Sequence, residues 1–341
     1  MNRHTLMFVH PKAVKIQQEK ITLPAENQVL VKTLYSSISA GTEMLLYRNQ
    51  VKQGMLMDTT IPALSIPFRF PCKYGYSCVG QVIAVGDNVN TKWLDALVFA
   101  FHPHESHFLI PSNEIIALPS GMELKDAMFL PNMETALNLM MDGSPLIGEN
   151  VVVFGQGVVG LLLTSLLAQM PLSSLITIDA YPLRRAMSER FGAMLTFTPG
   201  QGIQKHFQNQ ASKEPIAADL CFEVSGNPST LSQAIRCTRY AGRIIVGSWY
   251  GTKKTRLDLN DQFHRNRIHI ISSQVSTIDP RFADRWTKQR RLRFAFDMVQ
   301  KIRPSQLITH TFPFEQAEQA YKLIDSHPEK TIQVIFSYEG E

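Results

Sequence analysis

A glycine-rich segment in the middle of the chain has the residue types and spacing that hold a dinucleotide. The apolar residues 151–154 are followed directly by Gly155-Gln156-Gly157-Val158-Val159-Gly160, and an apolar stretch then continues to Met170. Glycines at this spacing permit a tight turn, close approach of the backbone to a pyrophosphate and close helix–strand packing. A helix that begins there directs its first N–H groups at the phosphates. We therefore predict a buried strand, a pyrophosphate-binding turn and a helix.

Asp179 is the candidate partner of the cofactor ribose. It follows a second apolar strand, 175–178, and lies 24 residues after Gly155, close to the usual spacing of about 20. A carboxylate there accepts hydrogen bonds from the ribose hydroxyls and repels a 2′-phosphate, so NAD is favoured over NADP. Arg184 and Arg185 follow closely and could still tolerate a 2′-phosphate. The alternative interpretation is a glycine turn and a helix-capping aspartate with no cofactor.

The rest of the chain must position the side chains that carry out the chemistry. With 341 residues, the chain is long enough for two domains. Its 44% apolar and 18% charged residues are typical of a folded soluble protein. Four cysteines form neither a Cys-x-x-Cys pair nor a disulfide framework, which suits a reducing cytoplasm.

The termini, apolar segments and charge exclude other classes of protein. The first twelve residues hold only a four-residue apolar run, so we expect no secretory signal. The longest apolar segment, 158–170, is too short for a bilayer. The net charge of +5 is accompanied by interspersed acidic residues and no nucleic-acid motif, so no nucleic-acid role is expected.

Two regions with different patterns follow each other along the chain. The first 120 or so residues have the short strands and turns of a small irregular barrel, and a helical stretch then runs from Leu124 to Met141, where Pro131 must start or kink a segment. From Asn150, strands and helices alternate, which predicts a parallel, doubly wound sheet. We predict one domain from 1–131 and 274–341, a dinucleotide-binding domain from 132–273, and an active site in the cleft between them.

Further segments carry a family resemblance. They are Ser39-Ala40-Gly41-Thr42-Glu43, Gly75-Tyr76-Ser77-Cys78-Val79-Gly80, 222–227 and 242–247. With the glycine turn and Asp179, they make nearly the whole chain resemble the medium-chain dehydrogenase/reductase superfamily, which includes zinc alcohol dehydrogenases and zinc-free quinone reductases. The resemblance implies an α/β fold with a GroES-like, β-rich catalytic domain and a Rossmann domain. Beyond the glycine turn, the candidate cofactor-binding residues are Asp179, Arg184, Val224, Ser225, Gly247 and Lys330.

The same resemblance shows where this chain departs from the zinc enzymes. A catalytic zinc in the family needs a thiolate, an imidazole and a third thiolate or carboxylate. The cysteine position is Ala40, the histidine position is Tyr76, and the third position falls near Pro131, with Glu134 three residues on. No cysteine lies between Cys78 and Cys221, where the structural zinc lobe would be. We therefore predict neither a catalytic nor a structural zinc.

Hydroxyl groups then become candidates for the chemistry. Hydride transfer to a carbonyl or to an activated double bond leaves negative charge, which needs a proton or fixed donors. Thr42 stands where the family keeps a proton-relaying hydroxyl. Tyr76 could be an acid/base or an oxyanion donor, with nearby positive charge lowering its pKa. Alternatively, its ring only fills the emptied metal pocket.

A histidine-rich segment, His102-Pro103-His104-Glu105-Ser106-His107, is the second candidate. We predict that His102 or His104 relays protons or contacts substrate. Two alternatives remain. His102, His104 and Glu105 could form a metal site outside the family pattern, or the histidines are only hydrogen-bonded or exposed.

Other charged and edge residues suggest positioning and assembly. Glu43 is expected to pair with a nearby base, and Lys330 resembles the family's late basic residue near the cofactor phosphates, although a solvated lysine is an equal alternative. A basic block comprises Arg281, Arg285, Lys288, Arg290, Arg291 and Arg293. It is interpreted either as a solvated helix face or as an anion site. The aromatic residues between these positions, Trp286, Phe294 and Phe296, are expected to be packed. Ile268–Val275 is the predicted homodimer interface, because this edge strand pairs across a dimer in relatives.

The leading prediction is an NAD(H)-dependent, zinc-independent, cytoplasmic oxidoreductase that transfers hydride between nicotinamide and an alcohol/carbonyl substrate. An NADPH-dependent quinone or enoyl reductase is the alternative among enzymes, since Tyr47-Arg48 resembles those reductases while Asp179 argues against them. A non-catalytic nucleotide-binding module is the alternative of another class. The expected partners are a small-molecule substrate, anionic if the basic block binds it, and a second copy of the chain, with no nucleic acid and no membrane.

Overall fold

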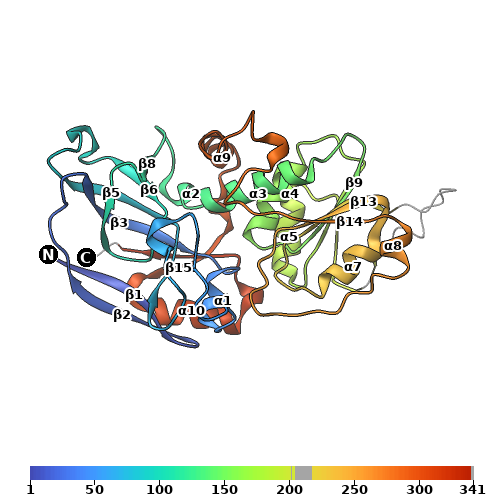
Figure 1. The fold of residues 1–341 in the computed structure, drawn as a ribbon, viewed down its shortest axis with the longest axis horizontal. Coiled ribbons are helices and arrows are strands. Elements are labelled where there is room, and N and C mark those ends of the chain that lie inside the picture. The colour runs from blue at the N-terminus through green and yellow to red at the C-terminus, as the bar shows by residue number, and fades with distance from the viewer. Residues whose placement is uncertain (201, 204–216, 339–341) are drawn as a thin grey trace. The chain divides into compact units, whose positions relative to one another are not determined.

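The computed structural model describes residues 1–200, 202–203 and 217–338, and it divides into two compact units. The first unit comprises Met1–Pro131 and Phe296–Glu341, and the second comprises Asn132–Ala295. Figure 1 shows the elements of each unit in sequence colours. The segment 274–295 groups with the second unit, beyond residue 273 where the sequence predicted that domain to end.

The first unit is rich in antiparallel strands, as the resemblance to a GroES-like domain implied. A three-stranded sheet has the order β2-β1-β4, and a seven-stranded sheet has the order β15-β16-β3-β5-β6-β8, with β7 paired to β3. The strand bounds are β1 Asn2–His10, β2 Ala13–Lys20, β3 Gln28–Ile38, β4 Cys72–Lys73, β5 Cys78–Val85, β6 Leu97–Ala100, β7 His107–Pro111, β8 Ile115–Ala117, β15 Ile308–Pro313 and β16 Gln333–Ser337.

Helices pack a core against these sheets. The helices are α1 Glu43–Tyr47, α2 Leu124–Ala127 and α10 Ala317–Ser326. Tyr321 on α10 stacks with Tyr47 on α1, with ring centroids 5.4 Å apart, and meets Phe8 of β1 edge-on at 5.3 Å. This apolar cluster fixes α1, which follows directly after the segment that carries Thr42.

The second unit is built on a six-stranded parallel sheet, which confirms the predicted doubly wound architecture. Its order is β11-β10-β9-β12-β13-β14. Residues 151–154 of β9 are fully buried, as an apolar run in the middle of a sheet covered on both faces must be. The bounds are β9 Asn150–Phe154, β10 Ser174–Ile178, β11 Leu195–Phe197, β12 Ala218–Glu223, β13 Thr238–Val246, β14 His269–Ser272, α4 Val158–Leu167, α5 Pro182–Arg190, α7 Thr230–Cys237 and α8 Gln262–Arg265.

Two longer helices each contain a point where the chain passes from one unit to the other. The predicted helical stretch 124–141 is divided into α2 and α3, Leu130–Gly143. Pro131 lies in the first turn of α3, where its missing N–H costs no helical hydrogen bond. The stretch 280–304 contains α9, Lys288–Ile302. Within the part of the chain that the structure describes, no helix has the length and apolarity to cross a membrane.

Candidate functional site

The register of the parallel sheet brings four predicted cofactor residues to one edge. Phe154 at the end of β9 pairs with Ile178 of β10 and with Glu223 of β12, and Glu223 in turn pairs with Val246 of β13. The residue that follows each of these strand ends is Gly155, Asp179, Val224 or Gly247. These four therefore lie side by side along the carboxyl edge, where ligands of open α/β sheets bind.

Two of the three glycines of the turn between β9 and α4, Gly155 and Gly160, are required because a Cβ there would clash with nearby backbone. Gly155 has φ +95°, and a Cβ there would lie 2.5 Å from the Cα of Ser225. A Cβ at Gly160 would lie 2.0 Å from the carbonyl oxygen of Gly155, so α4 packs directly on the turn. At Gly157, by contrast, a Cβ would meet no atom of the described residues within 4 Å. The open backbone surface at the start of α4 is what a pyrophosphate needs.

Asp179 is held against this turn. One carboxylate oxygen accepts the Gln156 N–H at 2.7 Å, and the other accepts the Tyr181 N–H at 2.9 Å. The side chain of Gln156 is also buried. It donates a hydrogen bond to the Gly155 carbonyl and accepts one from the Thr164 hydroxyl. The carboxylate is therefore fixed beside the glycine turn. Only 7% of the surface of Asp179 is exposed.

The other predicted cofactor residues lie at different places. Val158 and Val159 are half-buried in the first turn of α4. Arg184 lies over the Tyr181 ring, 4.9 Å from its centroid. Lys330 is exposed in a short turn, Pro328–Lys330, of the first unit.

Glu223 is a buried acid at the same edge that the sequence did not single out. It has no exposed surface, and its carboxylate accepts hydrogen bonds from the Ser225 backbone N–H at 2.9 Å, from the Ser225 hydroxyl and from the Tyr250 hydroxyl. The Ser225 segment is thus shaped by an acid that precedes it by two residues. A carboxylate directly after the apolar residues 220–222 was the signal available in the sequence.

A cluster of hydroxyl groups forms a second candidate centre, in the first unit. The Tyr76 hydroxyl donates to the hydroxyl of Ser39 and lies 3.4 Å from the Thr42 hydroxyl oxygen. The Tyr76 ring and Ala40 are partly buried against the apolar core. The structure thus brings Tyr76 and Thr42 together, as the sequence suggested, and adds Ser39, which sequence reasoning had not given a role.

The electrostatic surroundings of Tyr76 differ from the expectation. Burial raises the pKa of Tyr76 to about 12, and the negative charges of Glu43 and Asp58 act in the same direction against the Ser39 and Thr42 hydrogen bonds. The predicted lowering of this pKa by positive charge is therefore wrong. The hydroxyl keeps its proton at neutral pH, so it can donate a hydrogen bond but does not act as a base.

His104 belongs to a buried hydrogen-bond network. Its Nδ1 lies 2.7 Å from the Ser36 hydroxyl and its Nε2 lies 3.1 Å from the Glu43 carboxylate. Glu43 also accepts the Ser39 N–H at 2.7 Å and the Tyr321 hydroxyl. Glu43 and His104 have no exposed surface, so the predicted basic partner of Glu43 is confirmed and is His104.

His102 and Glu105 face other partners. The His102 ring stacks on Phe108 with centroids 4.0 Å apart, and burial lowers its pKa. Glu105 binds Arg3 at 3.1 Å and Lys73 at 2.8 Å. His102, His104 and Glu105 thus have separate partners, and the absence of a metal at these residues stays a prediction. Among the residues described, no group of three or more His, Cys, Asp or Glu side chains could hold a metal ion.

The four cysteines and one residue of the basic block are buried, while the other five residues of the block are exposed. All four cysteines are buried free thiols, as expected of packed cysteines. Arg291 does not belong to a solvated face, because it is fully buried and paired with Glu134 at 2.9 Å. Phe294, expected to be packed, is 41% exposed, whereas Phe296 is buried.

Comparisons with known proteins agree with this architecture. A family model described as zinc-binding dehydrogenase matches residues 158–289. The chain is 23% identical over 347 residues to D-guloside 3-dehydrogenase of Escherichia coli K12, an alignment that covers 96% of this chain and 98% of that protein. It is 25% identical over 306 residues to sorbitol dehydrogenase 1 of Saccharomyces cerevisiae, with 78% and 82% covered.

Solved structures show the same fold. A short chain alcohol dehydrogenase from Escherichia coli CFT073, complexed with NADH, superimposes with a TM-score of 0.79 at 18% identity and covers 99% of both chains. A dehydrogenase structure from Sinorhizobium meliloti 1021, bound to NADP, gives a TM-score of 0.77 at 16% identity over 99% of both chains. The chain is therefore similar to a zinc-binding dehydrogenase family over residues 158–289, and it shares the fold of these dehydrogenase structures along nearly its whole length.

Proposed function

We propose that this protein is an NAD(H)-dependent oxidoreductase that interconverts an alcohol and a carbonyl compound without a catalytic zinc. The observation that carries the proposal is the carboxyl edge of the parallel sheet, where the open turn at Gly157 lies beside the fixed carboxylate of Asp179. An open turn suits a pyrophosphate, and an acid beside it suits an unphosphorylated ribose.

Zinc fits poorly with the side chains at the corresponding positions. Ala40 has no donor atom, and the phenol of Tyr76 is a hydrogen-bond donor to Ser39 whose pKa is raised to about 12. A zinc ligand must instead offer a lone pair from a thiolate, an imidazole or a carboxylate. The buried thiols of Cys72 and Cys78 have raised pKa values, because burial disfavours the thiolate.

The hydroxyl cluster can supply what the zinc would have supplied. Nicotinamide, when bound, supplies or accepts the hydride. In the direction of carbonyl reduction, the Tyr76 hydroxyl donates its proton or a hydrogen bond to the developing oxyanion, and Thr42 and Ser39 orient that hydroxyl. In alcohol oxidation, the substrate carbinol gives its hydride to NAD and its hydroxyl proton to a solvent water molecule, while the hydroxyls of Thr42, Ser39 and Tyr76 hold the substrate oxygen by hydrogen bonds. The network of Glu43 and His104 holds the Ser39 backbone in place.

The substrate class proposed is a polyhydroxylated compound. Two relatives that align over most of their length are named for a D-guloside and for sorbitol. A site lined by hydroxyl donors and acceptors such as Ser39, Thr42 and Tyr76 is suited to bind a molecule with several hydroxyl groups. Sorbitol and D-gulosides are therefore the first compounds to test.

A double-bond reductase that uses NADPH is the second candidate. Arg184, close to Asp179 and stacked on Tyr181, is the observation that favours a phosphorylated ribose. The two candidates differ in nucleotide preference and in substrate.

Fluorescence titration with NADH and NADPH tests the proposal. We expect binding of one NADH per chain, tighter than NADPH by about 10-fold, because charge-assisted hydrogen bonds to the ribose are lost with NADPH. Turnover of sorbitol or a D-guloside with NAD should accompany it. Preference for NADPH with reduction of a quinone would favour the second candidate, and binding of neither nucleotide would exclude both.

A further inference from the structure

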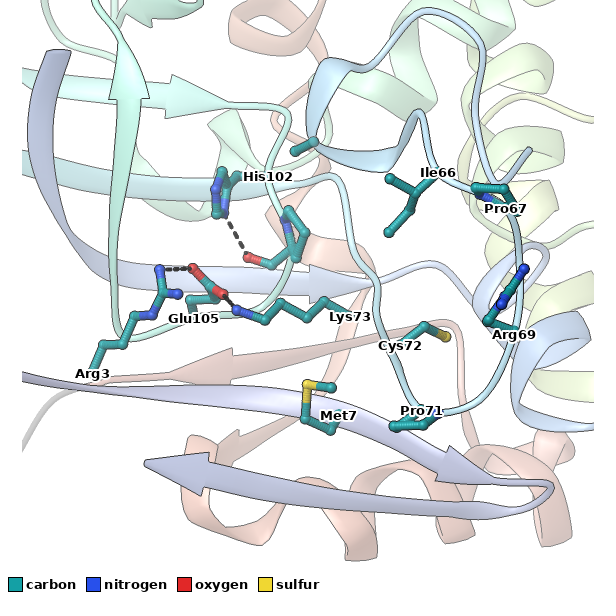
Figure 2. A pocket seen from close by; sticks show the side chains of 12 residues that line it. Arg3, Met7, Ile66, Pro67, Arg69, Pro71, Cys72, Lys73, His102 and Glu105 are labelled. Atoms are coloured by element: carbon teal, nitrogen blue, oxygen red, sulfur yellow. Dashed lines mark hydrogen bonds and ion pairs between the residues drawn. The ribbon is translucent and has the colours of Figure 1, made fainter. Parts of the chain in front are cut away.

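A pocket in the first unit shares no lining residue with the hydroxyl cluster or with the glycine turn. Its volume is about 540 Å³, within the usual range of about 300–1,000 Å³ for small-molecule sites. None of Ser39, Thr42 and Tyr76 lines it, and all of its lining residues come from 3–105. Figure 2 shows Arg3, Lys73 and Glu105 on one side of the pocket, and Ile66, Pro67 and Arg69 on the other.

The polar side of the pocket is organised around a buried carboxylate. Glu105, 2% exposed, binds Arg3 at 3.1 Å, Lys73 at 2.8 Å and the Thr5 hydroxyl at 3.3 Å. Arg3 and Lys73 also bind Glu19, at 2.7 Å and 3.1 Å. Burial would raise the pKa of Glu19, but the hydrogen bonds from both cations outweigh it and hold that pKa below its usual value. Two carboxylates thus balance two cations.

Hydrogen-bond donors remain available on this side. Arg3 uses three N–H groups on Glu19 and Glu105, and Lys73 uses two on the same carboxylates. A guanidinium carries five N–H donors and an ammonium three, so both side chains keep unused donors. The ion pairs fix their positions, which lowers the entropic cost of binding a ligand.

Arg69 adds a positive charge that nothing balances. It is exposed and makes no hydrogen bond or ion pair with any residue among 1–200, 202–203 and 217–338. The pocket therefore has one surplus positive charge, and this charge belongs to a side chain suited to bidentate binding of a carboxylate or phosphate. His102, also in the lining, has a lowered pKa because it is buried, so it adds no charge at neutral pH.

The opposite wall is apolar and open to solvent. Ile66 is 49% exposed, and Ala63, Pro67 and Pro71 are exposed beside it. An apolar wall facing fixed cations matches a ligand with an apolar body and an anionic head. We propose that this pocket is a binding site for a small amphipathic organic anion, a carboxylate or a phosphate monoester, held by Arg69 with the free donors of Arg3 and Lys73.

Isothermal titration of the full chain with cyclohexanecarboxylate, phenyl phosphate and the uncharged cyclohexanecarboxamide tests this site. We expect one anion per chain and at least 10-fold weaker binding of the carboxamide, because the charge-assisted hydrogen bonds are lost. Tighter binding of the carboxylate or of the phosphate identifies the head group, and either result supports the proposal. Equal affinity for the carboxamide, or no binding of either anion, overturns it.

Two variants separate this pocket from general attraction to a positive protein. Arg69→Gln removes the unbalanced charge from an exposed side chain, and we expect about 10-fold loss of affinity for the anion. Arg303→Gln removes the same charge from another exposed position of the first unit, outside the pocket, and should leave the affinity unchanged. An equal loss in both variants, or no loss in Arg69→Gln, contradicts the proposal. Neither result depends on turnover, so the test is independent of the proposed oxidoreductase activity.

Discussion

At the scale of single residues, burial determines the protonation states of Tyr76 and His102 at neutral pH. Tyr76 keeps its phenolic proton because burial raises its pKa to about 12. His102 stays neutral because burial lowers its pKa. Neither state could be deduced from the sequence, since both follow from neighbours that lie far away along the chain.

Substitution of Tyr76 tests its role as a donor. Tyr76→Phe keeps the ring but removes the hydroxyl, and we expect kcat to fall by about 10²- to 10³-fold with little change in NADH affinity. Tyr74→Phe is the matched control, because this tyrosine packs edge-on against Tyr76 at 6.2 Å but makes no hydrogen bond to Ser39 or Thr42. Steady-state kinetics of both variants decide the matter, and a fully active Tyr76→Phe would remove the phenol from the reaction.

His102 predicts a pH dependence of stability. The unfolded chain binds a proton on His102 near pH 6.5, whereas the folded protein resists protonation there. The stability linked to His102 is therefore fully present above about pH 6.5 and is lost as the pH falls below it. His102→Phe retains a ring to stack on Phe108, so its free energy of unfolding should fall less steeply between about pH 6.5 and pH 5. Identical slopes for both proteins in chemical denaturation would contradict this account.

At the scale of elements, strand register and helix packing place the groups that bind. The last residues of β9, β10, β12 and β13 pair with one another, so the residues that follow them, Gly155, Asp179, Val224 and Gly247, lie along one edge of the sheet. Helix α3 is tied to α9 within the second unit by Arg291, whose guanidinium binds Glu134 and Asn138 as well as the Thr277 carbonyl.

Asp179 should decide the nucleotide preference at this edge. Asp179→Asn removes the charge, so we expect about 10-fold weaker NADH binding and a smaller difference between NADH and NADPH. Asp284→Asn makes the same change at an exposed position of the second unit and should alter neither affinity. Fluorescence titration of both variants is the measurement. Unchanged nucleotide affinities in Asp179→Asn would show that the carboxylate only caps the backbone of Gln156 and Tyr181.

The buried ion pair of Arg291 and Glu134 should be costly to break from one side. Burial raises the pKa of Glu134, and the Arg291 charge offsets this only in part. Arg291→Met leaves a buried carboxylate without its cation, so we expect a loss of about 3–5 kcal/mol in the free energy of unfolding. The double variant Arg291→Met, Glu134→Met should recover part of that loss.

Arg293→Met is the control for this experiment, because it makes a similar change on an exposed position of the same helix. Its stability should stay within about 0.5 kcal/mol of the parent protein. Chemical denaturation followed by tryptophan fluorescence compares the three variants. Equal stability of Arg291→Met and Arg293→Met would be incompatible with a structural role for the pair.

At the scale of the whole molecule, we propose a homodimer through the exposed edge of the parallel sheet. Strand β14 is the last strand of that sheet, and Ile270 on it is 37% exposed. A lysine on an edge strand discourages pairing with another strand. We therefore expect Ile270→Lys to shift the protein from dimer to monomer in light scattering, whereas Ile147→Lys, at an 81% exposed position away from this edge, should remain dimeric. A monomeric parent protein would refute the interface.

Local sequence patterns predicted most of the strands and helices of the second unit. Contacts between residues far apart in the sequence could not be predicted from such patterns. Apolar runs and glycine spacing identified β9, α4 and the alternation that follows. The hairpin of β1 and β2 was missed, because its mixed polar strands show little apolar periodicity. Around Gly155 and Tyr76, the sequence named residues that the structure brings close to one another, and their function stays a prediction. The partnership of Glu43 with His104 was not, since 61 residues separate them and the contact depends on Gly75, where a Cβ would lie 2.8 Å from the His104 ring.

The most direct test of the account is turnover after removal of metals. Protein dialysed against a chelator, verified to be metal-free by elemental analysis, is assayed with NAD and sorbitol or a D-guloside beside the Tyr76→Phe variant. We predict that chelation leaves kcat unchanged and that Tyr76→Phe lowers it by about 10²-fold or more. Activity that disappears on chelation and returns with added Zn²⁺, while Tyr76→Phe stays active, would contradict the account.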